Sequence, residues 1–231
     1  MPVLALGLAL FLGTHIFTMF RDSRARLVER FGEASYKVTY SVLAALGLVL
    51  IGVGYGEYRQ DDWIDVWFPP VWAKHLALPM VWAALVLLVA AYLPGRIKAR
   101  VKHPMLLAVK LWATAHLISN GDLGSMLMFG AILAWAVAAR ISVKRRDEVQ
   151  PHGGEAAPSR TRNDLVAVVT ATAAYAAIAF WLHPQVIGVP IWPAPGGEQP
   201  HAQQPQAQQH SAPAAAPPRV EAAPLAKPGA L

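Results

Sequence analysis

Residues 36–56 read YKVTYSVLAALGLVLIGVGYG, and this stretch decides the fold class of the chain. Its length matches the roughly 20 apolar residues that an α-helix needs to cross the hydrocarbon core of a bilayer. Lipid cannot hydrogen-bond to the backbone, so a segment of this kind satisfies its own peptide groups as a helix. We interpret five further segments in the same way, at residues 2–20, 71–93, 104–119, 123–141 and 164–182. The sequence therefore predicts an all-α, polytopic membrane bundle of six transmembrane helices.

The composition excludes several other classes of protein. Hydrophobic residues make up 55% of the chain and charged residues only 15%, whereas charged residues approach about a quarter of an ordinary soluble domain. The formal net charge is +6, but the basic residues lie in short loops and form no patch for nucleic acid. The chain has no cysteine, which excludes disulfides, thiolate metal sites and cysteine nucleophiles. The expected partner is the lipid bilayer.

The charges of the loops predict the orientation of the chain. Loops at residues 21–37, 96–102 and 140–162 contain most of the 20 lysines and arginines, whereas the loop after residues 36–56 is acidic. Loops rich in Lys and Arg stay in the cytoplasm during insertion. We therefore expect a multi-pass protein of the bacterial inner membrane with both termini on the periplasmic side. The first segment lacks the basic start of a signal peptide, so we expect it to remain as a helix.

The C-terminal part of the chain differs in composition from the rest. Residues 191–231 are rich in Pro, Ala and Gln and contain few bulky apolar side chains. Such a segment cannot bury enough apolar surface to offset the entropy that ordering removes. We therefore divide the chain into a transmembrane domain at residues 1–190 and a disordered tail at residues 191–231.

The fourth apolar segment is short and ends in a turn signal. Residues 120–122 read Asn-Gly-Asp, and Gly and Asn readily take the backbone conformations that end a helix. We expect a tight helical hairpin here rather than one long helix. Within the segment, Trp112, His116 and Asn120 share one face at about 100° per residue.

Three histidines are candidate site residues. An ionisable side chain costs about 2.5–3.5 kcal/mol at the centre of a membrane helix on insertion scales. His15 in the first segment is therefore either a neutral imidazole bonded to a neighbouring helix or a functional residue. His103 and His116 belong to the fourth segment, where about 140° and about 19 Å of helix separate them. These two cannot bind one ion from a straight helix.

The residues around these histidines resemble the NnrU family of membrane proteins. The resemblance covers roughly residues 2–190 and is most specific in the fourth segment and the turn that follows it. The matching runs are His103-Pro104-Met105, residues 111–123, Phe129-Gly130, residues 15–21, residues 30–33 and residues 36–41.

The resemblance implies a function and a cofactor. The NnrU family is associated with nitrite and nitric oxide reduction in denitrifying bacteria. A related branch, the 15-cis-zeta-carotene isomerase, is an integral membrane enzyme with haem b bound by histidines. By motif, His15 and His116 correspond to the iron ligands, and His103 is a further candidate for cofactor binding. We expect Asn120 or another polar neighbour to orient the His116 ring through its second nitrogen.

Two functions follow from this resemblance. The first is a haem b-binding membrane protein linked to denitrification or to isoprenoid or carotenoid isomerisation; if it is an enzyme, it is a haem-dependent, isomerase-like one. The alternative is a non-catalytic accessory factor for a respiratory or denitrification membrane complex. One geometric difficulty accompanies the first function. Counted from the basic loops, His15 lies about 9 Å deep and His116 about 18 Å.

Overall fold

A computed structural model describes residues 1–149, 161–188 and 191 of the chain. The described residues form helices joined by short loops, and their only β-type pairing is an isolated bridge between Asp65 and Asp122. The predicted tail at residues 191–231 lies outside the described residues, except for residue 191. The elements are α1 (Pro2–Phe17), α2 (Arg21–Phe31), α3 (Glu33–Asp61), α4 (Val71–Ala90), α5 (Arg96–Val101), α6 (Pro104–Ser119), α7 (Leu123–Val149), α8 (Thr161–Ala177), the π-helix η1 (Ile178–Leu182) and α9 (His183–Ile187).

Every predicted apolar segment coincides with a helix, which confirms the helical membrane bundle. Among the described residues, four helices are long and apolar enough to cross a membrane: α3, α4, α7 and the continuous helix Thr161–Ile187. Helix α1 reaches that length only together with α2, from which it is bent by 88°. Helix α6 has 16 residues and is therefore about 24 Å long. The count of six membrane crossings stays a prediction.

Several helices extend beyond the apolar segments that predicted them. Helix α3 begins at Glu33 rather than at residue 36 and ends at Asp61 rather than at residue 56. Its first turn carries an ion pair between Lys37 and Glu33, four residues apart, at 2.8 Å. Such pairs stabilise a helix in water. A prediction based on hydropathy alone therefore places the start of this helix too late in the sequence. The charged helix α2 was missed for the same reason, because it lies wholly within the basic loop of residues 21–37.

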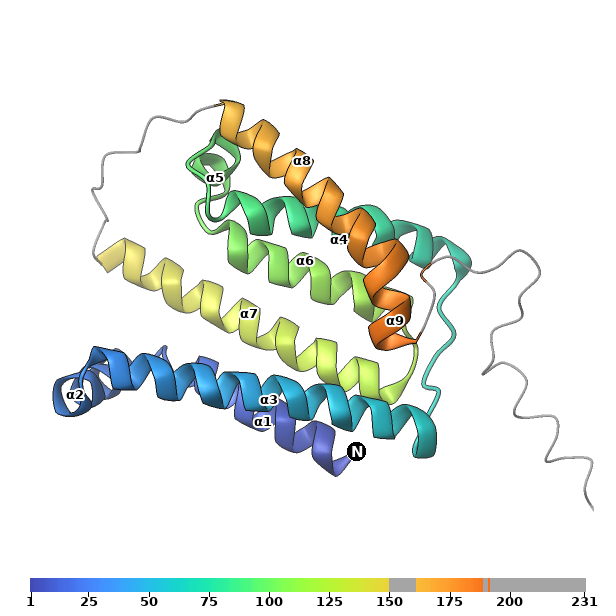
Figure 1. Cartoon of the computed structure of the whole chain (residues 1–231), viewed down its shortest axis with the longest axis horizontal. Coiled ribbons are helices and arrows are strands. Elements are labelled where there is room, and N and C mark those ends of the chain that lie inside the picture. Colours follow the sequence, from blue (N-terminus) through green and yellow to red (C-terminus); the bar gives the residue numbers. More distant parts are fainter. Residues whose placement is uncertain (150–160, 189–190, 192–231) are drawn as a thin grey trace, which may run out of the picture.

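The helices form two groups that meet along α7. In the first group α1 packs against α3, and in the second α4 packs against both α6 and α8. Helix α7 packs against α1 on one side and α6 on the other, as Figure 1 shows. The α1–α3 contact depends on glycines, because a Cβ on Gly47 would lie 2.7 Å from the backbone nitrogen of Phe11. Small residues at such interfaces let membrane helices approach closely.

The bundle has two chemically different ends. The acidic end comprises Met1, residues 61–70 and residues 120–122, and there the terminal amine of Met1 lies 3.0 Å from the Asp62 carboxylate. The basic end comprises α2, α5 and the first turn of α3, which lie on the left of Figure 1, with α5 near its top and α2 near its bottom. At the basic end, Asp164 accepts hydrogen bonds from the backbone nitrogens of Arg96 and Ile97, at 3.0 and 3.1 Å. This places the start of α8 against the start of α5.

Candidate functional site

His15 lies in the last turn of α1, among aromatic side chains from three helices. Its ring nitrogen Nδ1 lies 2.7 Å from the backbone carbonyl oxygen of Phe11, one turn earlier. The ring centroid is 4.3 Å from that of Phe11, 5.5 Å from that of Tyr40 on α3 and 5.2 Å from that of Trp135 on α7. A carbonyl oxygen can only accept, so Nδ1 carries the hydrogen and Nε2 of the neutral ring keeps its lone pair.

His116 repeats this arrangement in the last turn of α6. Its Nδ1 lies 2.8 Å from the backbone carbonyl oxygen of Trp112. The ring lies 4.9 Å from the Trp112 ring and stacks on Phe129 of α7 at 4.5 Å between centroids. The predicted shared face of Trp112 and His116 is thereby confirmed. Nε2 of His116 is again the nitrogen with the lone pair, and neither this atom nor Nε2 of His15 has a hydrogen-bond partner among the described residues.

Of the two alternatives for the group that orients the His116 ring, the structure shows another polar neighbour and not Asn120. The Asn120 side-chain nitrogen donates to the backbone carbonyl oxygen of His116 at 2.8 Å and so caps the end of α6. The ring is held instead by the Trp112 carbonyl, which the sequence could not distinguish from Asn120 because both lie four residues from His116 on the same face.

The structure places His15 and His116 in separate surroundings. They contact Trp135 and Phe129 of α7, which are about 9 Å apart along that helix and about 120° apart around it. Helix α7 therefore contacts the two imidazoles with different faces. His103 immediately precedes α6, at the opposite end of that helix from His116. Among the described residues no group of three or more His, Asp or Glu side chains is placed to hold a metal ion.

His183 is a residue whose position the sequence did not predict. The sixth apolar segment was predicted to end at residue 182, but the helix continues through His183 and Pro184 to Ile187. The π-helix η1 directly precedes it, and such wide turns interrupt α-helices frequently at functional sites. His183 is half-buried and lies near His116. The signal that could have located it is Pro184, which removes a backbone donor inside an apolar helix.

The residues that follow α6 form the turn of the α6–α7 hairpin and contact the loop of residues 61–70 at the acidic end. Asp122 is buried and caps α7, because its Oδ1 accepts from the backbone nitrogen of Ser125 at 2.8 Å. The Gly121 carbonyl oxygen accepts from the backbone nitrogens of Val66 and Trp67 at 2.8 and 3.0 Å. The predicted tight hairpin is confirmed, and its polar residues are engaged in capping and backbone pairing.

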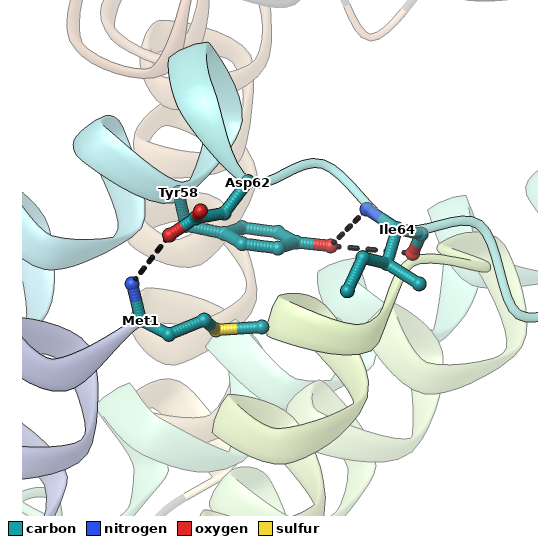
Figure 2. A network of polar contacts seen from close by, with 4 residues as sticks. All are labelled: Met1, Tyr58, Asp62 and Ile64. Carbon is teal, nitrogen blue, oxygen red and sulfur yellow. Dashed lines mark hydrogen bonds and ion pairs between the residues drawn. The ribbon is translucent and has the colours of Figure 1, made fainter.

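Two tyrosines of α3 complete this polar contact. The Tyr58 hydroxyl accepts from the backbone nitrogen of Ile64 at 3.2 Å and lies 3.3 Å from the Ile64 carbonyl oxygen. Figure 2 shows this pair beside the Met1–Asp62 ion pair. One turn earlier, the Tyr55 hydroxyl hydrogen-bonds to the Ser125 hydroxyl at 2.7 Å. The acidic end is thus closed by paired polar groups.

Comparison with known protein families finds a match that covers nearly all of the residues described above. The sequence profile described as NnrU protein matches residues 3–191. The chain belongs to the NnrU family. This confirms the resemblance drawn from the histidine and Asn-Gly-Asp motifs. No curated protein and no solved structure matches the chain.

Within this NnrU chain the motif residues divide into two kinds. Residues 120–122 use their polar groups for caps and backbone hydrogen bonds. His15 and His116 each use only Nδ1 in this way, and their rings lie among aromatic side chains. His15 and His116 are therefore the motif residues that keep a ring nitrogen available to bind a ligand.

Proposed function

We propose that this chain is a haem b-binding protein of the bacterial inner membrane in which His15 and His116 would each offer an imidazole to the haem iron. The observation that carries the proposal is the shared hydrogen bond from each Nδ1 to the carbonyl oxygen four residues earlier. A histidine that ligates a metal almost always donates a hydrogen bond from its other ring nitrogen to a partner of this kind. That hydrogen bond fixes the tautomer and raises the basicity of the ligating nitrogen.

The donor set and its surroundings fit one imidazole per haem. Neutral imidazole is an ordinary axial ligand of haem iron, and the rings of Phe11, Tyr40 and Trp135 beside His15 provide apolar walls. Trp112 and Phe129 do the same for His116. Because the two imidazoles contact different faces of α7, we assign them to separate positions rather than to one iron. His103 is a further candidate at the basic end.

In this proposal the neighbours of His15 and His116 hold the two imidazole rings in place. The carbonyls of Phe11 and Trp112 hold the ring tautomers, and the aromatic neighbours provide apolar contacts to the two rings. A bound haem b would supply a redox-active iron. A link to denitrification or to isoprenoid or carotenoid isomerisation rests on the family relationship, and catalysis, if it occurs, would be haem-dependent and isomerase-like. We place both termini on the periplasmic side from the charges of the loops.

Absorption spectroscopy of the full-length chain tests the proposal. The protein purified in detergent and reconstituted with haem b should show a Soret band, and pyridine haemochrome analysis should give its stoichiometry. His116→Ala and His15→Ala should each lower the bound haem, whereas His75→Ala, which removes an exposed histidine of α4, should not. Circular dichroism of each variant checks that the helices remain.

The same experiment distinguishes the alternative function. A protein that stays colourless after reconstitution would refute haem binding. If such a protein also co-purified with a subunit of a nitrite or nitric oxide reductase, a non-catalytic accessory role in that complex would replace our proposal. His183→Ala provides a third arm, because a loss of haem in this variant equal to that in His116→Ala would place His183 at the same position.

A further inference from the structure

Helix α2 lies across the bundle at its basic end. It is bent by 88° from α1, and Figure 1 shows it nearly end-on beside the start of α3. Three residues separate its first residue from α1, and Gly32 alone separates its last residue from α3. Helices α1 and α3 pack against each other, so both ends of α2 are fixed at the level where two membrane-embedded segments terminate.

One face of α2 carries large apolar side chains that the chain leaves uncovered. Phe20, Leu27 and Phe31 are 61%, 37% and 58% exposed. At about 100° per residue these three side chains lie within about 40° of one another around the helix. We call them the apolar stripe of α2. Exposed apolar side chains of this size indicate contact with a partner or with lipid.

The apolar stripe faces the same way as the part of the bundle that enters the membrane. Arg24 lies on the same side of α2 by the helical repeat, and its guanidinium is 5.5 Å from the centroid of the Tyr36 ring in the first turn of α3. This cation–π contact turns that side of α2 toward α3. Helix α3 is long and apolar enough to cross a membrane, so the apolar stripe is directed toward the acyl layer around it.

Two arginines flank the apolar stripe. Arg21 and Arg30 lie about 80–100° to either side of it around the helix. Both are exposed, and neither forms an ion pair with a carboxylate of the described residues. With the stripe among acyl chains, guanidinium groups at these two positions reach the depth of the headgroup phosphates, which arginine binds with paired hydrogen bonds.

The opposite face of α2 has the composition of a surface in water. It contains Asp22, Arg26 and Glu29, which lie about 180–240° from the stripe and are all exposed. The two acidic residues of the helix are thus on the side away from the lipid. Charge on α2 is therefore separated, with unpaired arginines beside the apolar stripe and the carboxylates behind it.

We infer that α2 is an interfacial anchor that binds the anionic phospholipids of the leaflet at the basic end. A charged helix with one apolar stripe lies in the plane of the membrane interface. Four arginines against two acidic residues make an anionic lipid surface a better partner than a zwitterionic one. The inference uses none of the proposed iron ligands, so it holds whether or not haem binds.

The depth of α2 in a bilayer tests the first part of the inference. The chain has no cysteine, so Leu27→Cys and Arg26→Cys each provide a single site for a nitroxide label. The full-length chain is reconstituted into vesicles of phosphatidylcholine and phosphatidylglycerol. The label at residue 27 should be more accessible to oxygen than to a water-soluble nickel complex, and the label at residue 26 should show the reverse. Val49→Cys, at an exposed position within α3, gives the reference for the acyl layer.

Two results of this measurement would overturn the inference. Labels in water at both positions would show that α2 stands clear of the membrane. Labels in lipid at both positions would show that α2 continues the membrane crossing of α1 as one broken span.

The lipid preference tests the second part. A bimane label at residue 27 is quenched by brominated phosphatidylglycerol or by brominated phosphatidylcholine at equal mole fraction, and the anionic lipid should quench about threefold more. Arg30→Gln should lower this ratio about twofold. Arg26→Gln removes the same charge from the opposite face and should leave the ratio nearly unchanged. Equal quenching by the two lipids, or equal effects of Arg26→Gln and Arg30→Gln, would refute a site made by the arginines that flank the stripe.

Discussion

The acidic and basic ends of this bundle differ in whether their buried polar side chains are hydrogen-bonded. At the acidic end, Asp122 caps α7 and the hydroxyls of Tyr55 and Tyr58 are hydrogen-bonded. At the basic end, the Tyr36 hydroxyl is buried without a partner among the described residues, and so is Nε1 of Trp135, deeper on α7 beside His15. The polar groups of the acidic end therefore hold chain segments together, whereas these two atoms of the basic end do not.

The difference arises from how closely the chain segments approach. At the acidic end the backbone of residues 120–122 touches the loop of residues 64–67, and glycines permit the contact. At the basic end the corresponding space is a pocket lined by long side chains. Four substitutions test whether this contrast has the physical basis that we assign to it.

The largest effect is expected from Gly121→Ala. A Cβ at this position would overlap the carbonyl oxygen of Trp67, and because that atom belongs to the backbone, the loop must move. We expect a loss of about 3 kcal/mol in the free energy of unfolding, measured by denaturation in detergent. Gly130→Ala is the control, since a Cβ there meets nothing within 4 Å. A similar loss in both variants would show that close packing at residue 121 is not the cause.

Asp122→Ala removes the cap of α7. The backbone nitrogen of Ser125, which is bonded to Asp122 Oδ1 at 2.8 Å, then lacks its partner inside the protein. We expect a loss of about 1–2 kcal/mol in unfolding free energy. Asp122→Asn keeps an oxygen that can cap the helix and should retain most of the stability. If the Asn variant is as unstable as the Ala variant, the carboxylate charge matters more than the cap.

Tyr55→Phe removes one hydroxyl and keeps the ring. The Ser125 hydroxyl is then buried without its 2.7 Å partner, so we expect the free energy of unfolding to fall by about 1 kcal/mol. The double variant with Ser125→Ala should recover part of this loss, because both members of the pair are then absent. No recovery would indicate that the hydrogen bond is not the source of the effect.

The smallest effect is expected from Tyr36→Phe, which makes the same chemical change at the basic end. The Tyr36 hydroxyl has no partner to lose among the described residues, so the stability of the variant should stay close to that of the wild type. Side-by-side denaturation of Tyr36→Phe and Tyr55→Phe measures the contrast directly. Equal losses in the two variants would remove the distinction between the two ends.

Much of the arrangement near the site follows from local sequence. The Asn-Gly-Asp run predicted the α6–α7 hairpin, and the spacing of Trp112 and His116 predicted their shared face. Both inferences depend on turn preferences and on the helical repeat, which involve residues within a few positions of one another. The predicted difference in depth between His15 and His116 also agrees with their contacts at two levels of α7.

Other features could not be obtained in this way. Trp135 is the α7 neighbour of His15, although 120 positions separate the two residues in the chain. Gly121 is required because Trp67 approaches it, and the turn residues alone gave no reason to expect that contact. The unpaired state of the Tyr36 hydroxyl depends on which groups are absent from its surroundings.

The sequence by itself determined that this chain is a helical membrane bundle and where most of its helices lie, because lipid requires each apolar segment to satisfy its own backbone hydrogen bonds. It also identified the histidines of the NnrU motif. Only the tertiary structure decided that α7 contacts His15 and His116 with different faces, that one end is closed by paired polar groups, and that a pocket forms at the other end between α1, α2 and α3. These features depend on contacts between distant helices, and no periodicity within a single helix encodes them.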